Sequence, residues 1–264
     1  DSIRALNFFS NVDVKEVRTE FPDKINLEII VEEKNTGEAS LGAGYSSATS
    51  SSLNIGLKET NFLGKGQKLN FTSSFSNTRN TYDISFTEPY FNNKKLALTG
   101  NLYSNFYDPG SVNYETEDIG FGINAQFPLS SNVYLDTRYS LFTSKVKADA
   151  NATAYERLLS GTDTISTIGY TLRYDKRNSR YKPSRGFIFE IDQDIAGLGG
   201  TSYYFKNRID YNFYKRLNDD LIGAFKFQAG NLNGYNGKYA PLSSNFKLGG
   251  KKLRGFKSGK VGPR

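Results

Sequence analysis

From residue 39 onward, apolar and polar side chains alternate along the chain with a period of two. Segment 119–127 shows the pattern clearly, because Ile119, Phe121 and Ile123 alternate with glycine and asparagine residues. Successive side chains of a β-strand point to opposite faces of the sheet, so each such segment predicts a strand with one apolar and one polar face. Eleven alternating segments occur between residues 39 and 230, and we therefore predict eleven strands.

Strand length and charge favour a transmembrane β-barrel over a soluble β-sandwich, whose strands also alternate. The segments approach the roughly 9–11 residues with which a tilted strand crosses a bilayer. Their polar faces carry charges on several strands, such as Arg138, Arg173 and Asp192, which suits a water-filled lumen. The predicted fold class is all-β, with a transmembrane antiparallel β-barrel. Aromatic residues near strand ends suit the girdles at the two membrane surfaces, namely Tyr45, Tyr90, Phe91, Tyr107, Tyr203 and Tyr204.

The connections between the predicted strands alternate in length. Short ones follow the second and sixth strands, at residues 63–66 and 128–132, whereas longer ones follow the fifth and seventh, the longest at residues 145–166. Outer-membrane barrels have short periplasmic turns and longer outside loops, so the N-terminal region is predicted to be periplasmic. Residues 176–185 are an exception, as a long periplasmic connection. Residues 152–159 predict a helical turn within the longest loop.

Residues 1–37 have a different character from the rest of the chain. Val12, Val14 and Val17 precede a predicted turn at Pro22–Lys24, and residues 25–32 then alternate again. This arrangement predicts a hairpin of a small α+β domain whose first part lies outside the sequence. Residues 32–37 would be the linker, so we divide the chain into domains at 1–37 and 38–264.

Composition excludes several classes of function. The 264 residues contain no Cys and no His, which removes disulfides, thiol chemistry, the usual acid–base group near neutral pH and the commonest metal ligand. No Met stands at position 1 and no signal peptide is visible, so we expect a fragment of a longer product. The net charge of +7 is spread along the chain and mixed with acidic residues, which argues against nucleic-acid binding.

Other polar clusters predict no chemistry. The carboxylate pairs Asp192/Asp194 and Asp219/Asp220 are not catalytic candidates, because the first pair shares the polar face of a strand and the second sits in a turn. The glycine-rich segment 197–200 is interpreted as a loop between strands and not as a phosphate cradle, because no helix follows it. We therefore predict no catalytic residue, no metal and no cofactor.

Three segments resemble motifs of the bacterial surface antigen family, also called the BamA family, and together the resemblance covers nearly the whole chain. The first ends a strand with Glu88, Pro89, Tyr90 and Phe91. The second is a turn with Asp175, Arg177, Asn178, Pro183 and Gly186. The third is a loop motif with Leu253, Arg254, Gly255 and Phe256, where the family more often has a β-branched residue in place of the leucine. Each motif alone is weak, and their order and spacing carry the resemblance.

The resemblance implies an architecture. Residues 1–37 would be the end of the last POTRA domain, and residues 38–264 the first eleven of sixteen barrel strands, ending in the long sixth extracellular loop. The last five strands would lie beyond residue 264. An open sheet leaves unpaired edges that lipid does not tolerate, so we expect that this chain alone is not a self-sufficient membrane protein.

The resemblance also implies a function, which is the assembly and insertion of β-barrel proteins into the outer membrane of a Gram-negative bacterium, without enzymatic chemistry. The implied partners are the outer-membrane lipid bilayer, unfolded outer-membrane protein substrates and accessory assembly lipoproteins, with no nucleic acid. A polypeptide exporter of the same superfamily, of the two-partner secretion type, is the main alternative. A passive outer-membrane pore or a barrel enzyme would be a different class, and an enzyme would need a nucleophile and base for which no His exists.

Three groups of site residues follow from the family. Arg254 would fold into the lumen and meet carboxylates on strands beyond residue 264, with Gly255 permitting close backbone approach; the alternative is a solvated loop arginine. Asp175 and Arg177 would pair across their turn, which we interpret as structural. The first strand, predicted at residues 40–47, would form a labile seam with the last strand and act as a lateral gate; the alternative is an ordinary first strand. Its proposed gate residues are Leu41, Gly42, Ala43, Gly44 and Tyr45.

Overall fold

The computed structural model describes residues 6–18, 20, 25–46, 50–108, 110–249, 253–257 and 261, and these are almost entirely β-structure. Two strands precede the main sheet, β1 (Phe9–Arg18) and β2 (Ile25–Glu33). The strands of the main sheet are β3 (Gly37–Ser46), β4 (Ser50–Phe62), β5 (Gln67–Ser76), β6 (Arg79–Glu88), β7 (Ala97–Tyr107), β8 (Tyr114–Pro128), β9 (Val133–Ala148), β10 (Gly161–Asp175), β11 (Gly186–Gly200), β12 (Tyr204–Arg216) and β13 (Ile222–Gly234). The helical pieces are η1 (Phe91–Asn93), α2 (Ala154–Leu158) and η2 (Leu242–Ser244).

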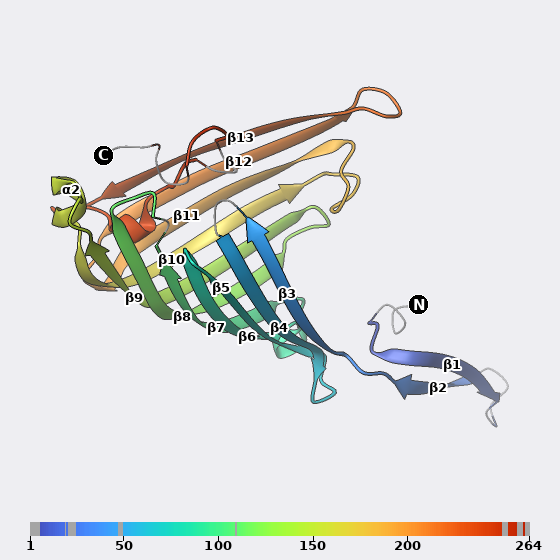
Figure 1. The fold of residues 1–264 in the computed structure, drawn as a ribbon. Coiled ribbons are helices and arrows are strands. Elements are labelled where there is room, and N and C mark those ends of the chain that lie inside the picture. Colours follow the sequence, from blue (N-terminus) through green and yellow to red (C-terminus); the bar gives the residue numbers. More distant parts are fainter. Residues whose placement is uncertain are drawn as a thin grey trace.

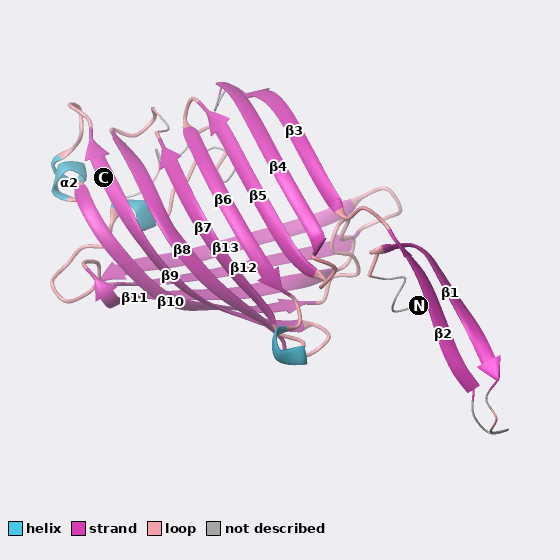
Figure 2. Cartoon of the chain, turned by 90° about the horizontal axis from the view of Figure 1, so that it is seen from below, coloured by secondary structure: helices cyan, strands magenta, loops and turns pink. Residues whose placement is uncertain are grey.

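The main sheet contains eleven strands in sequence order from β3 to β13, and each strand pairs antiparallel with its neighbours along the chain. This confirms the predicted strand count and the all-β class. The sheet curls into an open trough, with β3 to β9 on one wall and β10 to β13 turning behind them (Figure 1). The separate β1–β2 hairpin lies beyond the beginning of β3, which we use to name the two ends of the sheet (Figure 2). The hairpin end also carries the β4–β5, β6–β7, β8–β9, β10–β11 and β12–β13 turns, and the loop end lies opposite.

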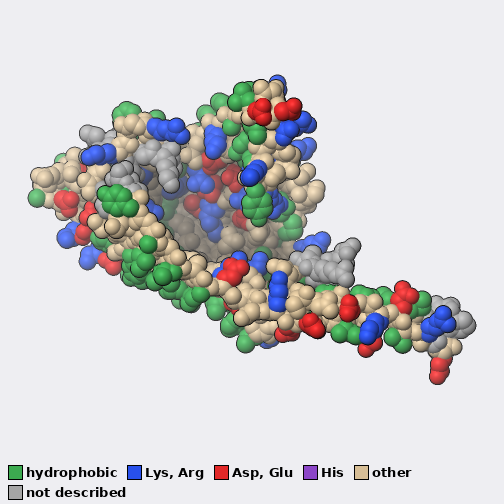
Figure 3. Space-filling model, turned by 45° about the vertical axis from the view of Figure 1, so that its right-hand side comes forward, with side chains coloured by type: hydrophobic (Ala, Val, Ile, Leu, Met, Phe, Trp, Pro, Cys, Tyr) green, Lys and Arg blue, Asp and Glu red, His purple; other side chains and the backbone are tan. Residues whose placement is uncertain are grey.

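The two faces of the trough differ as the alternation predicts. Ile119 and Ile123 on the convex, outer face of β8 are exposed at 54% and 47%, as are many other large apolar side chains of the sheet. Charged side chains instead line the hollow on the concave, inner face (Figure 3). A sheet with this polarity suits a lipid-facing exterior and a wet interior.

Ion pairs that cross strands hold the inner face together. The Arg138 guanidinium of β9 lies 2.6 Å from Asp194 and 3.2 Å from Asp192, both on β11. It also donates a 2.8 Å hydrogen bond to Thr171 of the intervening strand β10. A second arginine on β10, Arg173, pairs with Glu190 of β11 and lies 3.8 Å from Asp136 of β9. These carboxylates were predicted only to share a polar face, and the structure shows that they bind arginines.

A glycine makes the first of these ion pairs possible. Gly169 of β10 is the register partner of both Arg138 on β9 and Asp194 on β11, so the arginine reaches its acid directly over the glycine. A Cβ atom at Gly169 would lie 2.1 Å from the Asp194 carboxylate and 3.1 Å from the Arg138 guanidinium. Any side chain at this position would displace the pair.

Several predicted boundaries were wrong because strands extend further than a bilayer requires. The longest loop spans residues 149–160 and not 145–166, since β9 and β10 pair up to Val146 and Gly161. Residues 197–200 belong to β11 and not to a loop, because Gly200 still pairs with Ile165. The register shifts between Ile165 and Thr167, and Gly197 on the irregular stretch opposite has a positive φ. Likewise β13 continues to Gly234, beyond residue 230.

Other expectations have mixed outcomes. The helical turn in the longest loop is confirmed as α2, with a capping box between Thr153 and Glu156. The first strand begins at Gly37, earlier than predicted, and both Ser47 and the Pro22–Lys24 turn lie outside the described residues. Tyr107 and Tyr204 were wrongly assigned to an interfacial girdle, because both lie on the inner side near the loop end of the sheet. The Tyr107 ring lies 4.1 Å from the Lys247 ammonium, and Tyr204 is 4% exposed and packs with Ile165 and Ala196. In the described part of the chain, no helix has the length and apolarity needed to cross a membrane.

The geometry around Gly169 gives a stability prediction. Gly169→Ala should separate Arg138 from Asp194, whose side chains are 23% and 20% exposed, and lower the free energy of unfolding by about 1–3 kcal/mol. The matched control is Gly42→Ala on the inner face of β3, because no atom of the described residues lies within 4 Å of a Cβ at Gly42. Urea unfolding of the intact protein in lipid vesicles measures both. Equal stability of the two variants would contradict the role given to Gly169.

Candidate functional site

The segment after β13 folds back onto the inner face of the sheet at the loop end, and we call residues 235–249 the inner loop. Leu242 is 3% exposed and packs against Tyr114 of β8 and Val146 of β9. Ala240 is 8% exposed and joins the cluster of Ile165 and Ala196. These two apolar contacts seat the inner loop against four neighbouring strands, β8 to β11.

Polar contacts fix the direction of the same loop. The Tyr235 hydroxyl donates a 2.6 Å hydrogen bond to the carbonyl of Ala196. The Lys238 ammonium donates to the carbonyl of Thr201 at 2.9 Å. From the wall, the Lys206 ammonium of β12 donates to the carbonyl of Ser244 at 2.7 Å and lies 5.1 Å from the centre of the Phe246 ring. Charge-assisted bonds to carbonyl oxygens are stronger than neutral ones, so Lys238 from the loop and Lys206 from the wall are the two polar clamps.

A lysine of the inner loop rests on an aromatic ring of the wall. The Lys247 ammonium lies 4.1 Å from the ring centre of Tyr107, and the Arg79 guanidinium lies 4.7 Å from the same ring. Burial lowers the pKa of Lys247 to about 8, helped by the nearby Arg79 cation and opposed by the Asp118 carboxylate. The attraction of both cations to one ring therefore offsets part of their mutual repulsion.

A polar cavity of 220 Å³ remains between the inner loop and the wall. Its lining includes Asp118, Arg138, Asp194, Lys206 and Ser244. Charges of both signs are mixed around it, and no group of three or more carboxylates that could hold a metal ion occurs among the residues that the structure describes. The arrangement can bind water and fix the loop.

The predicted latch motif lies beyond this seat. Leu253, Arg254, Gly255 and Phe256 are all exposed, and no ion pair of Arg254 occurs within the described residues. Its pairing with carboxylates past residue 264 remains a prediction. The φ of +88° at Gly255 favours a glycine there, and no atom of the described residues lies within 4 Å of a Cβ at this position. The close approach of Gly255 to strands past residue 264 stays a prediction.

The predicted gate strand β3 forms one edge of the sheet. In the described part of the chain it pairs only with β4, in continuous register from Gly37–Glu59 to Ser46–Ser50. Leu41 and Tyr45 are 76% and 81% exposed on the outer face. The inner-face positions Gly42 and Gly44 carry no side chain to pack, which leaves the middle of this strand lightly packed. Side-chain contacts to β4 include the Glu38–Lys58 ion pair of 3.8 Å and a hydrogen bond from Ser40 to the carbonyl of Gly56.

The turn motif holds together in the way the sequence predicts. Arg177 donates two side-chain hydrogen bonds, of 2.9 and 2.7 Å, to the two oxygens of Asp175, and the carboxylate raises the pKa of Arg177. The Asn178 side chain accepts from the backbone of Ser184 and Arg185 across the turn. Gly186 has a φ of +94°, and a Cβ there would lie 2.1 Å from the carbonyl oxygen of Lys176. A structural role for the motif is consistent with these contacts.

The strand-ending motif has a comparable internal bond. Glu88 is the last residue of β6, and its carboxylate accepts from the Gln67 side chain at 2.8 Å and from the Tyr90 backbone at 3.1 Å. Tyr90 and Phe91 then project at the hairpin end, 57% and 46% exposed, as expected for girdle residues.

Comparison with protein families gives one match to most of the chain. The model described as the Omp85 superfamily domain matches residues 61–264. Among curated proteins, the chain is similar to outer membrane protein assembly factor BamA of Nitratidesulfovibrio vulgaris, with 28% identity over 272 residues that cover all of this chain and 34% of the relative. It is also similar to the human sorting and assembly machinery component 50 homolog, with 28% identity over 216 residues that cover 81% of this chain and 46% of the relative.

Comparison with solved structures supports the fold. Crystalline BamA from Haemophilus ducreyi lacking POTRA domains 1–3 superimposes with a TM-score of 0.90 at 23% identity, covering 99% of this chain and 54% of that one. CdiB from Acinetobacter baumannii superimposes with a TM-score of 0.53 at 15% identity, covering 97% of this chain and 50% of that one. This chain spans about a third of the length of the curated BamA relatives that it matches.

The seat of the inner loop gives a second prediction. A cysteine introduced at Leu242 in the intact protein should react slowly with a water-soluble thiol reagent, because the site is 3% exposed. Adding Lys206→Gln removes the hydrogen bond that clamps the carbonyl of Ser244. The labelling rate at position 242 should then rise about tenfold, because a loss of roughly 1.4 kcal/mol makes local opening of the loop about ten times more frequent.

Lys226→Gln on the same face of neighbouring β13 is the matched control and should leave the rate unchanged. A cysteine at Tyr239, which is 65% exposed, should react fast in every background. An unaltered rate at position 242 in the Lys206→Gln variant would show that the clamp does not hold the loop.

Proposed function

We propose that this chain, which belongs to the Omp85 superfamily and forms the strands of an outer-membrane β-barrel, is part of a protein that assembles and inserts other β-barrels into the outer membrane of a Gram-negative bacterium. The chain spans about a third of the BamA relatives, so the activity is proposed for the intact protein that contains it. The names of those relatives, assembly factor and sorting and assembly machinery component, motivate the role.

The observation that carries the proposal is the edge strand β3. Its outward side chains Leu41 and Tyr45 are exposed, and its glycines give it little side-chain packing, so its stability rests mainly on the ladder to β4. When the proposed seam with the last barrel strand opens, β3 would offer backbone N–H and C=O groups to an incoming strand, which gains hydrogen bonds without matching side chains. Such pairing is tolerant of sequence, as an insertase for many substrates requires.

The reaction would be physical and not enzymatic. An unfolded barrel segment exposes backbone groups that lipid cannot satisfy, at a cost of several kcal/mol for each group left unpaired. Pairing with β3 would satisfy one side of that segment while it enters the bilayer. We propose no cofactor and no catalytic residue; the partners would be the bilayer, unfolded outer-membrane proteins and accessory lipoproteins.

The β1–β2 hairpin supports a periplasmic domain. Val14, Leu27 and Ile29 share one face of the hairpin through the pairs Val14–Ile29 and Glu16–Leu27, and all three are more than two-fifths exposed. An apolar face of this size is normally covered by the rest of a domain. We propose that the hairpin belongs to a POTRA domain, which would lie in the periplasm beside the hairpin end of the sheet.

An exporter of the same superfamily is the alternative. The fold of this chain follows BamA far more closely than CdiB, with TM-scores of 0.90 and 0.53, which favours the assembly role. Depletion of the intact protein in its own host separates the two. An assembly protein should cause several unrelated outer-membrane barrels to decline together, whereas an exporter should cause one secreted polypeptide to decline while barrel levels stay normal.

A crosslinking experiment tests the edge directly. A photoreactive residue at Ser40 of β3 in the intact protein should crosslink to a barrel substrate arrested during assembly, because β3 would pair with its strand. The control position is Ser140 on β9, which has paired neighbours on both sides in β8 and β10. Crosslinks that are equally frequent at both positions, or absent from Ser40, would count against strand pairing at β3.

A further inference from the structure

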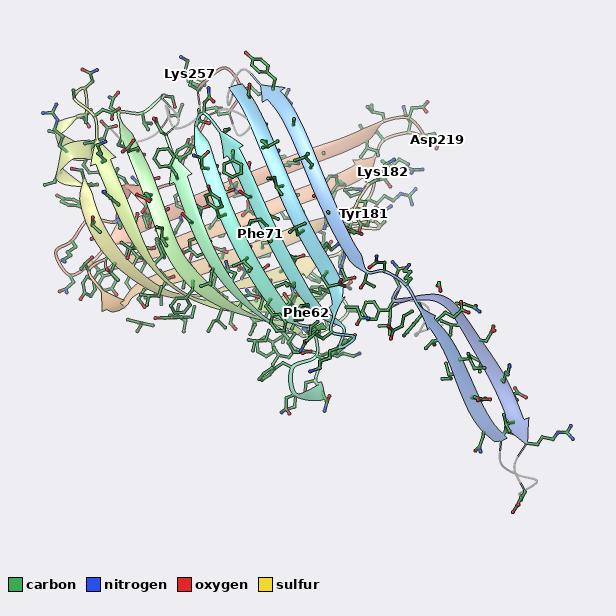
Figure 4. The ribbon with its side chains drawn as sticks, turned by 60° about the horizontal axis from the view of Figure 1, so that its bottom comes forward. Phe62, Phe71, Tyr181, Lys182, Asp219 and Lys257 are labelled. Atoms are coloured by element: carbon green, nitrogen blue, oxygen red, sulfur yellow. The ribbon has the colours of Figure 1, made fainter. Side chains whose placement is uncertain are left out.

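A groove of 660 Å³ opens on the outer face at the hairpin end of β5, β6 and β7, and we call it the outer groove. It is lined by Lys65, Phe86, Glu88, Leu98 and Gly100, together with Gln67 and the turn residues 90–93. Phe62, whose ring meets that of Phe86 edge-on at 6.3 Å, marks the same end of the sheet (Figure 4). None of the motif functions described above accounts for this groove.

The strand register places the groove on the convex face. Phe86 pairs with Gly100, and Glu88 pairs with Leu98, so these four positions share one face of β6 and β7. The opposite face carries the hydrogen bond from Asn101 to Asp83, which belongs to the polar interior. The outer groove therefore opens on the apolar side of the sheet, which faces hydrocarbon in an outer-membrane barrel.

The floor of the groove is formed by a glycine, which has no side chain to fill it. Gly100 lies mid-sheet on β7, and no atom stands within 4 Å of the place where its Cβ would be. Phe86 and Leu98 flank this gap with apolar surface, and Phe86 is 39% exposed. A methylene chain laid over Gly100 would contact both walls and bury apolar surface from the interfacial water.

The mouth of the groove is cationic. Lys65 lines it from the β4–β5 turn, and Lys94 and Lys95 are exposed on the adjacent β6–β7 turn. The one carboxylate in the lining, Glu88, already accepts hydrogen bonds on both oxygens, from Gln67 and from the backbone of Tyr90. The lysine charges can therefore attract an anion from outside the protein. The site lies beside exposed Tyr90 and Phe91, which are residue types typical of a membrane surface.

We propose that the outer groove binds a single phospholipid with a net negative headgroup, its phosphate beside Lys65 and one acyl chain over Gly100. Charge complementarity selects the anionic headgroup over a zwitterionic one, and the apolar floor requires an attached acyl chain. The proposal depends on the outer face being in contact with lipid and not on the assembly activity. An acidic protein partner would also be attracted by the lysines, but its charged surface would not fill the apolar gap over Gly100.

Native mass spectrometry of the intact protein in detergent tests the site, with dioleoylphosphatidylglycerol and dioleoylphosphatidylethanolamine as the two titrated lipids. The first phosphatidylglycerol should bind tighter than phosphatidylethanolamine. Lys65→Gln should weaken it about fivefold, the effect of roughly 1 kcal/mol for one basic residue near an anionic lipid. Gly100→Leu should weaken it at least as much by filling the groove, and its side chain has room to do so.

The matched control is Lys182→Gln, the same change of charge on the β10–β11 turn at the same end of the sheet but apart from Phe62 (Figure 4). Phosphatidylglycerol affinity should be unchanged in this variant. An equal loss in Lys182→Gln would show diffuse attraction of the whole rim and overturn the site. Full phosphatidylglycerol affinity in Gly100→Leu would also overturn the site, because the headgroup would then bind without an acyl chain over position 100. Equal binding of the two lipids by the unaltered protein would overturn it as well.

Discussion

The pairing of Arg138 with Asp192 and Asp194 across three strands is the interaction on which the rest of the structure depends. A charged side chain in hydrocarbon costs several kcal/mol, so a sheet with this inner face has to curl and enclose it. Gly169 allows the pair to form by leaving the space between arginine and acid open. The outer face can then be mainly apolar, with polar side chains such as Glu88 near the strand ends, and the trough follows from the difference between its two faces.

The inner loop uses the same wall. Lys206 belongs to the charged face of β12 and clamps the carbonyl of Ser244, while Leu242 and Ala240 fill the apolar patches that interrupt the charges near the loop end. The loop thereby covers polar groups of the wall. Within the described residues, the edge strand β3 has fewer side-chain contacts, and this contrast between a clamped wall and a lightly packed edge is in keeping with the proposed assembly role.

Alternation was enough to predict the eleven strands and their two faces, because these depend on local sequence and register. The Asp175–Arg177 pair was expected from the turn motif that resembles the family's, and its two residues are close neighbours in the chain. The seat of the inner loop could not be predicted, since Leu242 meets Val146 across about a hundred residues of chain. Tyr204 was misassigned because an aromatic residue at a strand end can face either side. The sequence did contain one indication of where the inner loop packs. The Ala-Pro-Leu stretch at 240–242 is unusually apolar for a loop otherwise rich in Gly, Asn, Ser and Lys.

The central claim is that one face of the sheet meets lipid and the other meets water. Cysteine scanning along β8 tests it most directly, in the intact protein reconstituted into bilayers and treated with a membrane-impermeant maleimide. The account predicts that cysteines at the inner-face positions Asn124 and Gln126 react, whereas those at Ile119, Phe121 and Ile123 are protected by lipid. Reaction at both sets of positions, or protection of the inner set alone, would contradict it.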